Sequence, residues 1–316
     1  MAVATPRLRR APSAGGERVR EALVGYAFIF VPLGLFGLLY LYPIVHAFYV
    51  SVHEWGGIEG NLGYVGLDNF RDLRDDTQFW TWPPERGTAL WNTFYFALLV
   101  VPLQMALGLL MALIVNQPIR GRAFFRSAYY FPALTSSAAI SVIAIYLLNA
   151  NGLVNAAIGA LVPGDFNHPW FGDPDTALES IVALDAWTTS GTMMLFYLAA
   201  LQSIPTDVYE AAALDGGGGW RTFWRITFPL LKPAHFFVAV VSVIGALKLF
   251  DQAYIISTGS GGPAGSTMTG VLYLYRVVIS EFNFGYGAAV GVVLFLIIFT
   301  LTLFQRLLFG KAEIGY

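Results

Sequence analysis

The chain contains no cysteine, and only 12% of its 316 residues are charged. The lack of Cys excludes a disulfide scaffold, a thiol nucleophile and a thiolate metal site. The charged fraction is about half that of an ordinary soluble domain, whereas 56% of the residues are apolar, and the net charge of −2 gives no basis for a nucleic-acid partner. Because so few charged residues cannot cover the surface of a water-soluble protein with polar groups, the composition indicates a polytopic membrane protein.

Long apolar runs recur along the chain, and a helix needs about 20 such residues to cross the hydrocarbon core. Six runs are long enough: Ala22–Val45, Leu90–Val115, Phe124–Leu148, Leu178–Leu201, Ala234–Ile256 and Gly285–Leu308. The stretch Met268–Phe284 is shorter and contains Arg276 and Glu281, so we expect an interfacial or re-entrant helix there. The sequence therefore predicts an all-α protein with six transmembrane helices.

The basic residues predict the orientation of these helices, because Lys and Arg near membrane edges collect on the cytoplasmic side. With six crossings and a cytoplasmic N-terminus, most of the 18 basic residues fall on that side: Arg7, Arg9, Arg10, Arg18, Arg20, Arg120, Arg122, Arg126, Arg221, Arg225, Lys232, Arg306 and Lys311. We therefore expect both termini in the cytoplasm. Residues 1–21 are predicted to form a disordered basic tail, and residues 22–316 a single membrane domain.

The inner segment Ser203–Pro233 has the most specific pattern in the chain. Good helix formers end at Asp215, which is followed by four glycines that allow a sharp turn. Trp220, Phe223, Trp224 and Thr227 then recur at helical spacing. These features predict a short helix, a glycine turn and an amphipathic helix. By residue type alone, the segment is either a docking surface for a soluble partner or a connecting loop with an interfacial helix.

The same segment resembles the EAA loop of ABC importer membrane subunits. The residues that match the pattern of that loop are Glu210, Ala211, Ala212, Asp215, Gly216, Phe223, Ile226, Pro229 and Pro233. One departure is Gly217, where the family usually has Ala, and we expect it to loosen the turn. The resemblance implies that this loop, residues 203–233, couples the chain to a separate ATPase.

Other segments extend the resemblance to carbohydrate-type (or glycerol-3-phosphate-type) permeases of the maltose-transporter MalF-like branch. The segment from Tyr42 to Trp55, the run Val65–Phe70 and the pair Asn92-Thr93 are each similar to elements of those permeases. Gly259–Pro263 resembles their Thr-Gly-Gly-Gly-Pro element, with Ser260 in place of a Gly.

The resemblance implies the type I ABC importer permease fold in the plasma (inner) membrane of a prokaryote. This subunit would form half of the translocation path for a sugar, an oligosaccharide or a similar polar solute. The implied partners are a second homologous permease, a dimer of ATP-binding subunits and an extracytoplasmic substrate-binding protein, besides membrane lipid. No cofactor is expected in this subunit, since ATP and Mg²⁺ belong to the partner ATPase.

Polar and aromatic residues within the predicted spans are candidates for the path, because sugar sites combine aromatic faces with hydrogen-bonding side chains. The candidates are Trp187, Tyr197, Ser242, Lys248, Asp251 and Tyr254, and each has packing as its alternative role. Lys248 and Asp251 lie three residues apart on the fifth predicted span, so a helix would let them pair. Among the glycines, we expect Gly191, Gly245, Gly287 and Gly291 to permit close helix packing.

Several kinds of chemistry have no support in the sequence. There is no G-x-x-x-x-G-K-[ST] pattern for ATP, no metal-ligand spacing among the four His residues, and no G-x-S-x-G nucleophile motif. The chain is therefore expected not to be an enzyme. The alternative function is a self-sufficient secondary carrier or channel, which would need a series of titratable groups within its spans or an inverted repeat. A membrane-embedded enzyme would need a clustered acid–base or metal set.

Overall fold

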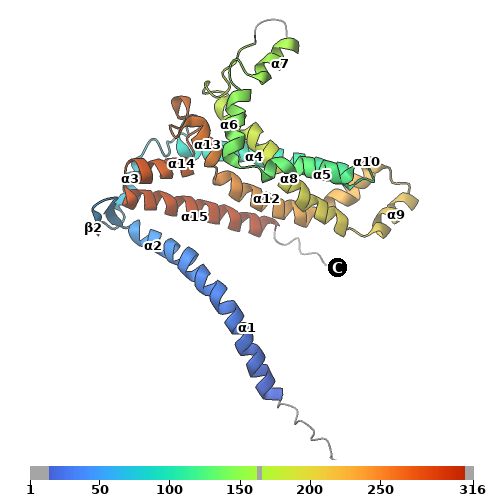
Figure 1. Ribbon diagram of the computed structural model, residues 1–316, viewed down its shortest axis with the longest axis horizontal. Helices are drawn as coiled ribbons and strands as arrows, with labels where there is room; N and C mark the ends of the chain where they lie inside the picture. The colour runs from blue at the N-terminus through green and yellow to red at the C-terminus, as the bar shows by residue number, and fades with distance from the viewer. Residues whose placement is uncertain (1–13, 162–165, 310–316) are drawn as a thin grey trace, which may run out of the picture.

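The computed structural model describes residues 14–161 and 166–309, which are mostly helical (Figure 1). The elements in chain order are α1 (Ala14–Phe36), η1 (Gly37–Leu41), α2 (Tyr42–Val50), β1 (His53–Gly56), β2 (Gly60–Tyr64), α3 (Asp68–Asp75), α4 (Ala89–Asn116), α5 (Arg122–Leu134), α6 (Ser137–Leu147), α7 (Leu153–Leu161), α8 (Ala177–Ser203), α9 (Thr206–Leu214), α10 (Gly219–Thr222), η2 (Phe223–Thr227), α11 (Phe228–Leu230), α12 (Lys232–Leu247), α13 (Asp251–Ser257), η3 (Pro263–Gly265), α14 (Gly270–Tyr275), η4 (Arg276–Ser280) and α15 (Phe284–Phe309).

The body of the molecule is a bundle in which α8 packs chiefly against α4, and also against α5 and α12. The long helices run along the longest axis, with α9 and α10 at one end and α3, the β1–β2 hairpin and α14 at the other (Figure 1). Two buried apolar clusters fill the bundle, one toward each end. The bundle therefore separates two ends, which we call the α9 end and the hairpin end.

The hairpin end is closed by polar contacts between segments far apart in the sequence. Asp76, which follows α3, accepts hydrogen bonds from the hydroxyls of Tyr273 and Tyr286. Partial burial alone would raise the pKa of Asp76, but these bonds and those from the backbone N–H groups of Gln78 and Phe79 outweigh it, so the pKa is lowered. The charged carboxylate thus holds the segment after α3 against α14 and α15.

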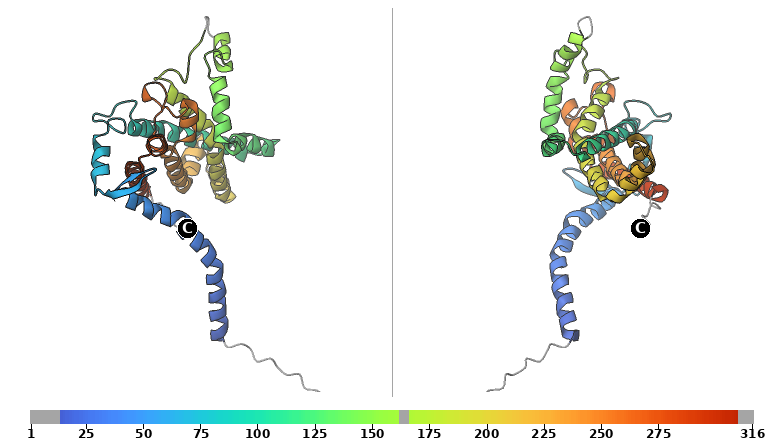
Figure 2. Two further views of the ribbon diagram at one scale, coloured as in Figure 1. Left: turned by 60° about the vertical axis from the view of Figure 1, so that its left-hand side comes forward. Right: turned by 90° about the vertical axis from the view of Figure 1, so that its right-hand side faces the viewer.

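The first apolar run forms one long helical arm that projects from the bundle (Figure 2). The apolar stretch Val19–Val50 runs through α1, a π-helical turn and α2, and none of its most apolar window is buried. Residues 1–13 of the predicted tail lie outside the described residues. The helix begins at Ala14, so residues 14–21 of the predicted tail are helical in the structure.

Within residues 14–161 and 166–309, four helical stretches are long and apolar enough to cross a membrane: Val19–Val50, Ala89–Asn116, Lys232–Ser257 and Phe284–Leu307. They correspond to the first, second, fifth and sixth predicted spans. The bent pair α5–α6 raises the number to five if it counts as one crossing.

The third predicted span, Phe124–Leu148, is not one straight helix. Its two halves, α5 and α6, meet at an angle of 94°. Thr135 and Ser136 both take non-helical backbone angles, with ψ of 143° and 131°. The Thr135 hydroxyl donates to the Phe131 carbonyl at 3.1 Å, which satisfies one of the carbonyls left free at the end of α5.

The fourth predicted span corresponds to α8, an unbroken helix of 27 residues. It is less apolar than the four stretches named above, since it contains Glu179, Asp185 and a run of Ser and Thr. Many of its residues are nevertheless buried by neighbouring helices, including Ser190, Met194 and Tyr197. Three hydroxyl residues of α8, Ser180, Thr188 and Ser190, are therefore buried, and Glu179 and Asp185 are half-buried.

The stretch Met268–Phe284 contains a short helix over Gly270–Ser280. Leu272, Tyr273 and Val277 are buried, and α14 packs on α4 and α15. Eleven residues of helix are about 16 Å long, which is too short to cross a bilayer. The short length agrees with the expected non-spanning helix.

Glycines bring several helices into close contact, as predicted for three of the four positions. A Cβ at Gly191 would collide with the Tyr129 carbonyl of α5, and one at Gly287 with Val278. A Cβ at Gly291 would lie 3.2 Å from Leu274. The prediction is wrong for Gly245, because no atom lies within 4 Å of a Cβ at that position.

This contrast gives a test of the packing. Gly191→Ala is expected to destabilise the protein by about 1–3 kcal/mol through overpacking between α5 and α8. Gly245→Ala is expected to stabilise it slightly, since Ala favours a helix over Gly by about 1 kcal/mol. Thermal unfolding of the purified variants measures both effects, and equal melting temperatures would contradict the packing.

Candidate functional site

The segment Ser203–Pro233, which we call the coupling loop, folds as two helices joined by a glycine turn. Helix α9 ends at Leu214, and Gly216 has a φ of +75°. The Gly216 N–H donates to the Ala213 carbonyl at 3.1 Å, and the Gly217 N–H donates to the Ala212 carbonyl at 2.9 Å. This pair of bonds is a Schellman motif, which requires a left-handed residue at the position of Gly216.

Gly217 does not loosen this turn, contrary to expectation. A Cβ at Gly217 would approach the Ala212 carbonyl oxygen to 2.7 Å and the Thr222 hydroxyl to 3.0 Å. The turn is closed tightly over this residue, and glycine fits it without displacing either neighbour.

The second helix of the coupling loop runs through α10, η2 and α11, as the aromatic spacing predicts. Its rings form a cluster in which Trp224 contacts Phe228 and Phe228 contacts His235 of α12, with centroids 5.1 and 4.5 Å apart. The buried Thr227 hydroxyl donates to the Tyr209 hydroxyl of α9 at 3.4 Å. The two helices therefore form one unit that continues into α12.

The nine residues of the EAA pattern all belong to this unit. Glu210, Ala211 and Ala212 lie in α9, and the others follow in order: Asp215 at its C-cap, Gly216 in the turn, Phe223 and Ile226 in η2, Pro229 in α11 and Pro233 in the first turn of α12. Ala212 is buried, whereas Glu210 and Asp215 are exposed. Leu214 and Trp220, beside the turn, are 90% and 76% exposed. The loop thus presents an apolar tip with acidic residues.

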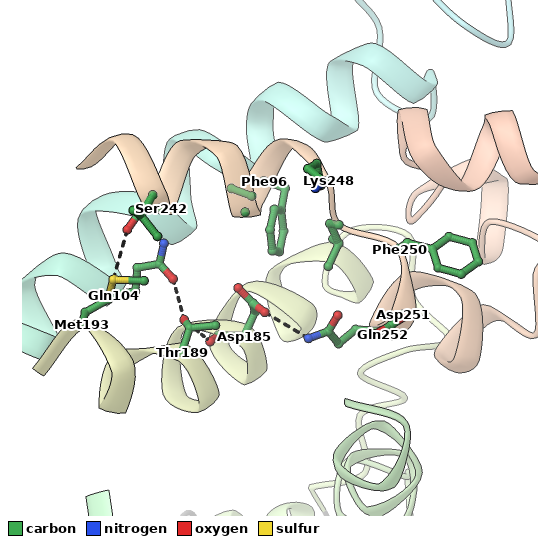
Figure 3. Close-up of a pocket in the computed structure, with 14 residues that line it drawn as sticks. Phe96, Gln104, Asp185, Thr189, Met193, Ser242, Lys248, Phe250, Asp251 and Gln252 are labelled. Carbon is green, nitrogen blue, oxygen red and sulfur yellow. Dashed lines mark hydrogen bonds between the residues drawn. The ribbon is translucent and has the colours of Figure 1, made fainter. Parts of the chain in front are cut away.

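A cavity of about 280 Å³, lined by both apolar and polar side chains, lies between α4, α8 and the broken helix α12–α13 (Figure 3). Its polar lining residues are Gln104, Asp185, Thr189, Ser242, Lys248, Asp251 and Gln252. Two aromatic residues, buried Phe96 and half-buried Phe250, also border the cavity. Carboxylates, amides and hydroxyls beside aromatic rings can bind a polyhydroxylated solute.

Hydrogen bonds link the three walls of this cavity. Gln252 Nε2 of α13 donates to Asp185 Oδ1 of α8 at 3.0 Å. Thr189 Oγ1 lies 2.5 Å from Gln104 Oε1 of α4. The dashed lines of Figure 3 show that both contacts lie at the cavity wall. Side chains from α4, α8 and α13 are therefore held in one polar site.

The structure brings three of the six candidate path residues together, namely Ser242, Lys248 and Asp251. Trp187 is 52% exposed on another face of α8, and Tyr254 packs against Phe250 and Tyr275. Tyr197 lines a separate, mostly apolar cavity of about 480 Å³, where its hydroxyl lies 3.0 Å from His235 Nδ1.

The predicted pair between Lys248 and Asp251 is wrong. The fifth span does not continue as one helix, because α12 ends at Leu247 and α13 begins at Asp251. Phe250 has φ −137° and ψ −59°, outside helical geometry. Spacing on a regular helix therefore does not apply, and the two exposed side chains form no ion pair with each other.

Sequence reasoning did not select three polar residues that the cavity brings together: Gln104, Asp185 and Gln252. Gln104 and Asp185 each interrupt an apolar run, which is the signal that could have found them, since polar groups inside the membrane face the protein interior. Gln252 directly follows the candidate Asp251. In the part of the chain that the structure describes, no three His, Asp or Glu side chains group closely enough to hold a metal ion.

Long apolar helices packed around a cavity that contains polar side chains define an integral membrane protein. Residues 104–313, about two thirds of the chain, match the family described as "Binding-protein-dependent transport system inner membrane component". The chain belongs to this family, and it is a permease component of the inner membrane. This establishes the predicted family and location.

Curated relatives cover most of the chain. The lactose transport system permease protein LacF of Rhizobium radiobacter is 34% identical over 285 residues, which cover 89% of this chain and 92% of that protein. The arabinooligosaccharides transport system permease protein AraP of Bacillus subtilis is 32% identical over 280 residues, which cover 87% of this chain and 85% of that protein.

Solved structures share the fold. A chain of a bacterial ABC transporter involved in import of the acidic polysaccharide alginate aligns with a TM-score of 0.77 at 19% identity, covering 96% of this chain and all of that one. A chain of a bacterial alginate ABC transporter in complex with a periplasmic protein bound to an alginate pentasaccharide aligns with a TM-score of 0.75 at 20% identity. The alignment covers 92% of this chain and 95% of that one.

The glycine turn can be tested without any assay of function. Gly216→Val should break the Schellman motif, because a left-handed backbone costs a β-branched residue about 1–2 kcal/mol. Hydrogen exchange at the amide of Gly217 should then become about tenfold faster. The matched control is Gly219→Ala, since Gly219 begins α10 and a Cβ there meets no atom within 4 Å. Unchanged exchange in Gly216→Val would contradict the turn.

Proposed function

We propose that the chain is one permease subunit of an ATP-driven importer for a sugar, an oligosaccharide or a similar polar solute. It forms half of the translocation path and couples to a separate ATPase through the coupling loop. The observation that carries this proposal is the continuity of α8, which lines the cavity at Asp185 and Thr189 and leads at Ser203 into the coupling loop. The transport roles named for LacF and AraP support the class of solute.

The proposed topology has six crossings with both termini in the cytoplasm. They are the arm α1–η1–α2, then α4, the bent pair α5–α6, α8, the broken pair α12–α13, and α15. The polar helix α8 crosses because its neighbours bury it, which is how polar residues are tolerated in membranes. This topology places the coupling loop in the cytoplasm and the hairpin end outside.

The cavity is proposed as this subunit's part of the path. Its carboxylates and amides accept and donate the hydrogen bonds that sugar hydroxyls need, and half-buried Phe250 lies at its edge. Lys248 and Asp251 are exposed beside the cavity, so a second, homologous permease is proposed to complete the path. The arm α1 offers that partner a further apolar surface, since its apolar window is not buried.

The coupling loop is proposed to dock into a dimer of ATP-binding subunits. Exposed Leu214 and Trp220 supply apolar anchors, and Glu210 supplies a charge beside them. ATP and Mg²⁺ would be bound by that dimer, and this chain would have no catalytic role. Closure of the dimer would move the loop, and α8 would carry the movement to the cavity as a rigid body. A substrate-binding protein would deliver the solute at the hairpin end, as the periplasmic protein of the alginate complex suggests.

A charge reversal in the loop tests this proposal. Glu210→Lys should remove the ATP-binding subunits from a complex purified in mild detergent from the native membrane, because it reverses the charge at the docking surface. The second permease should remain, since its contacts lie elsewhere. Quantitative mass spectrometry of the co-purified proteins gives the ratio of each subunit to this chain.

The matched control is Glu59→Lys, which makes the same charge change at an exposed residue of the hairpin. It should leave the ATP-binding subunits bound. Equal amounts of those subunits in both variants would contradict the docking role of Glu210. Purification of the unaltered chain with no ATP-binding subunit would contradict the importer itself.

A further inference from the structure

Two signatures of the sequence, Asn92-Thr93 and the glycine-rich segment that follows α13, meet in the structure although about 170 residues separate them. Asn92 and Thr93 lie in the first turn of α4, and the segment Thr258–Thr269 leads into α14. Asn92 is fully buried, Thr93 is 3% exposed and Thr269 is 1% exposed. Polar groups at this depth need partners within the protein.

The Asn92 side chain holds the loop through three hydrogen bonds. Its Nδ2 donates to the Gly265 carbonyl and to the Met268 carbonyl, both at 2.8 Å. Its Oδ1 accepts from the Gly87 N–H at 3.2 Å. Thr93 Oγ1 accepts from the Gly270 N–H at 2.9 Å. The start of α4 therefore fixes the backbone on both sides of Thr269.

Thr269 in turn reaches the break in the fifth span. Its hydroxyl donates to the Leu249 carbonyl at 2.7 Å, and the same oxygen accepts from the Leu272 N–H at 3.3 Å, capping α14. Leu249 lies between the last residue of α12 and the first of α13, and it is 5% exposed. A break in a membrane helix frees carbonyls that water cannot reach, so they must be satisfied by protein.

The break determines which side chains face the cavity. The break contains Lys248 and Phe250, and it is followed by Asp251, the first residue of α13. All three line the cavity, and Gln252 of α13 donates a hydrogen bond to Asp185 across it. Interrupted helices are a general means of placing backbone and side chains at a transport site. The Thr269 hydroxyl, which binds the Leu249 carbonyl in the break, therefore affects how the side chains of α12 and α13 line the cavity.

We propose that Thr269, held in place by Asn92 and Thr93, is a positioning residue that sets the geometry of the α12–α13 break and thereby the wall that the cavity presents to solute. It touches no solute itself. The link to transport rests on the proposed function, whereas the effect on the break does not. The chain lacks native cysteine, so engineered thiols can report on the break without background from this subunit.

The first measurement reads the geometry of the break directly. Cysteines are introduced as the pair Asp185→Cys and Gln252→Cys, and a short bifunctional thiol reagent cross-links them in the purified complex. Adding Thr269→Val, which removes the hydroxyl but keeps the shape, should lower the yield of cross-linked chain about fivefold, as loss of one buried hydrogen bond implies. Adding Thr269→Ser, which keeps the hydroxyl, should preserve the yield.

The control for removing a Thr hydroxyl is Thr302→Val, because the Thr302 hydroxyl bonds only to its own helix, at the Ile298 carbonyl. It should leave the yield unchanged. Thr93→Val provides a second test of the same network and serves if Thr269→Val does not accumulate in the membrane. An unchanged yield in both network variants would overturn the proposal.

The second measurement is uptake by the chain with its native Asp185 and Gln252. Thr269→Val should raise the KM for solute about fivefold with little change in the maximal rate, and Thr269→Ser should restore it. A general folding defect would lower the maximal rate instead. A lower cross-link yield with unchanged KM would overturn the transport role. If the unaltered complex imports no polar solute, the proposed function fails, but the cross-link result still decides whether Thr269 positions the break.

Discussion

The close packing of α8 against α4 and α5 is the interaction on which the rest of the structure depends. A helix that contains Glu179, Asp185 and several hydroxyl residues is stable within a membrane only where other helices bury it. The contacts are made at glycines: a Cβ at Gly108 of α4 would lie 2.6 Å from Met193 Cβ, and one at Gly191 would collide with α5. These small residues let α4 and α5 approach α8 closely.

Helix α8 connects the cavity to the coupling loop as one continuous helix. Asp185 and Thr189 lie on one part of the helix, and the loop begins after Ser203, about 20–27 Å further along a helix that rises 1.5 Å per residue. No break interrupts α8 over this distance. At the loop, the aromatic cluster and the Tyr209–Thr227 contact join its two helices and lead back into α12. Both helices that leave the coupling loop therefore reach the cavity.

The sequence was most informative where a pattern depends on neighbouring residues alone. The Schellman turn at Gly216 and the aromatic face of Trp220 and Trp224 follow from local spacing, and four apolar stretches follow from composition. The two breaks could not be predicted in this way. Thr135-Ser136 and Lys248–Phe250 lie within apolar runs, and what stabilises the second break is a contact with Thr269, a residue of another element. The supposed Lys248–Asp251 pair failed for the same reason, since helical spacing was assumed across the break.

The cavity shows the same limit of local patterns. Ser242, Lys248 and Asp251 were selected as polar residues of predicted spans, but Gln104 and Gln252 become site residues only because α4, α8 and α13 converge. Tyr197 and Tyr254 have suitable chemistry, yet their rings pack elsewhere. Residue type thus identified the kind of chemistry, whereas packing between helices determined which residues take part.

The most direct test of the account is solute uptake into sealed vesicles that contain the complex purified with this chain. We expect a neutral sugar or oligosaccharide to accumulate inside the vesicles only when ATP is supplied on the coupling-loop side and the substrate-binding protein on the hairpin side. Vesicles that contain this chain alone should accumulate none. Uptake by this chain alone, without ATP, would contradict the account and favour a self-sufficient carrier.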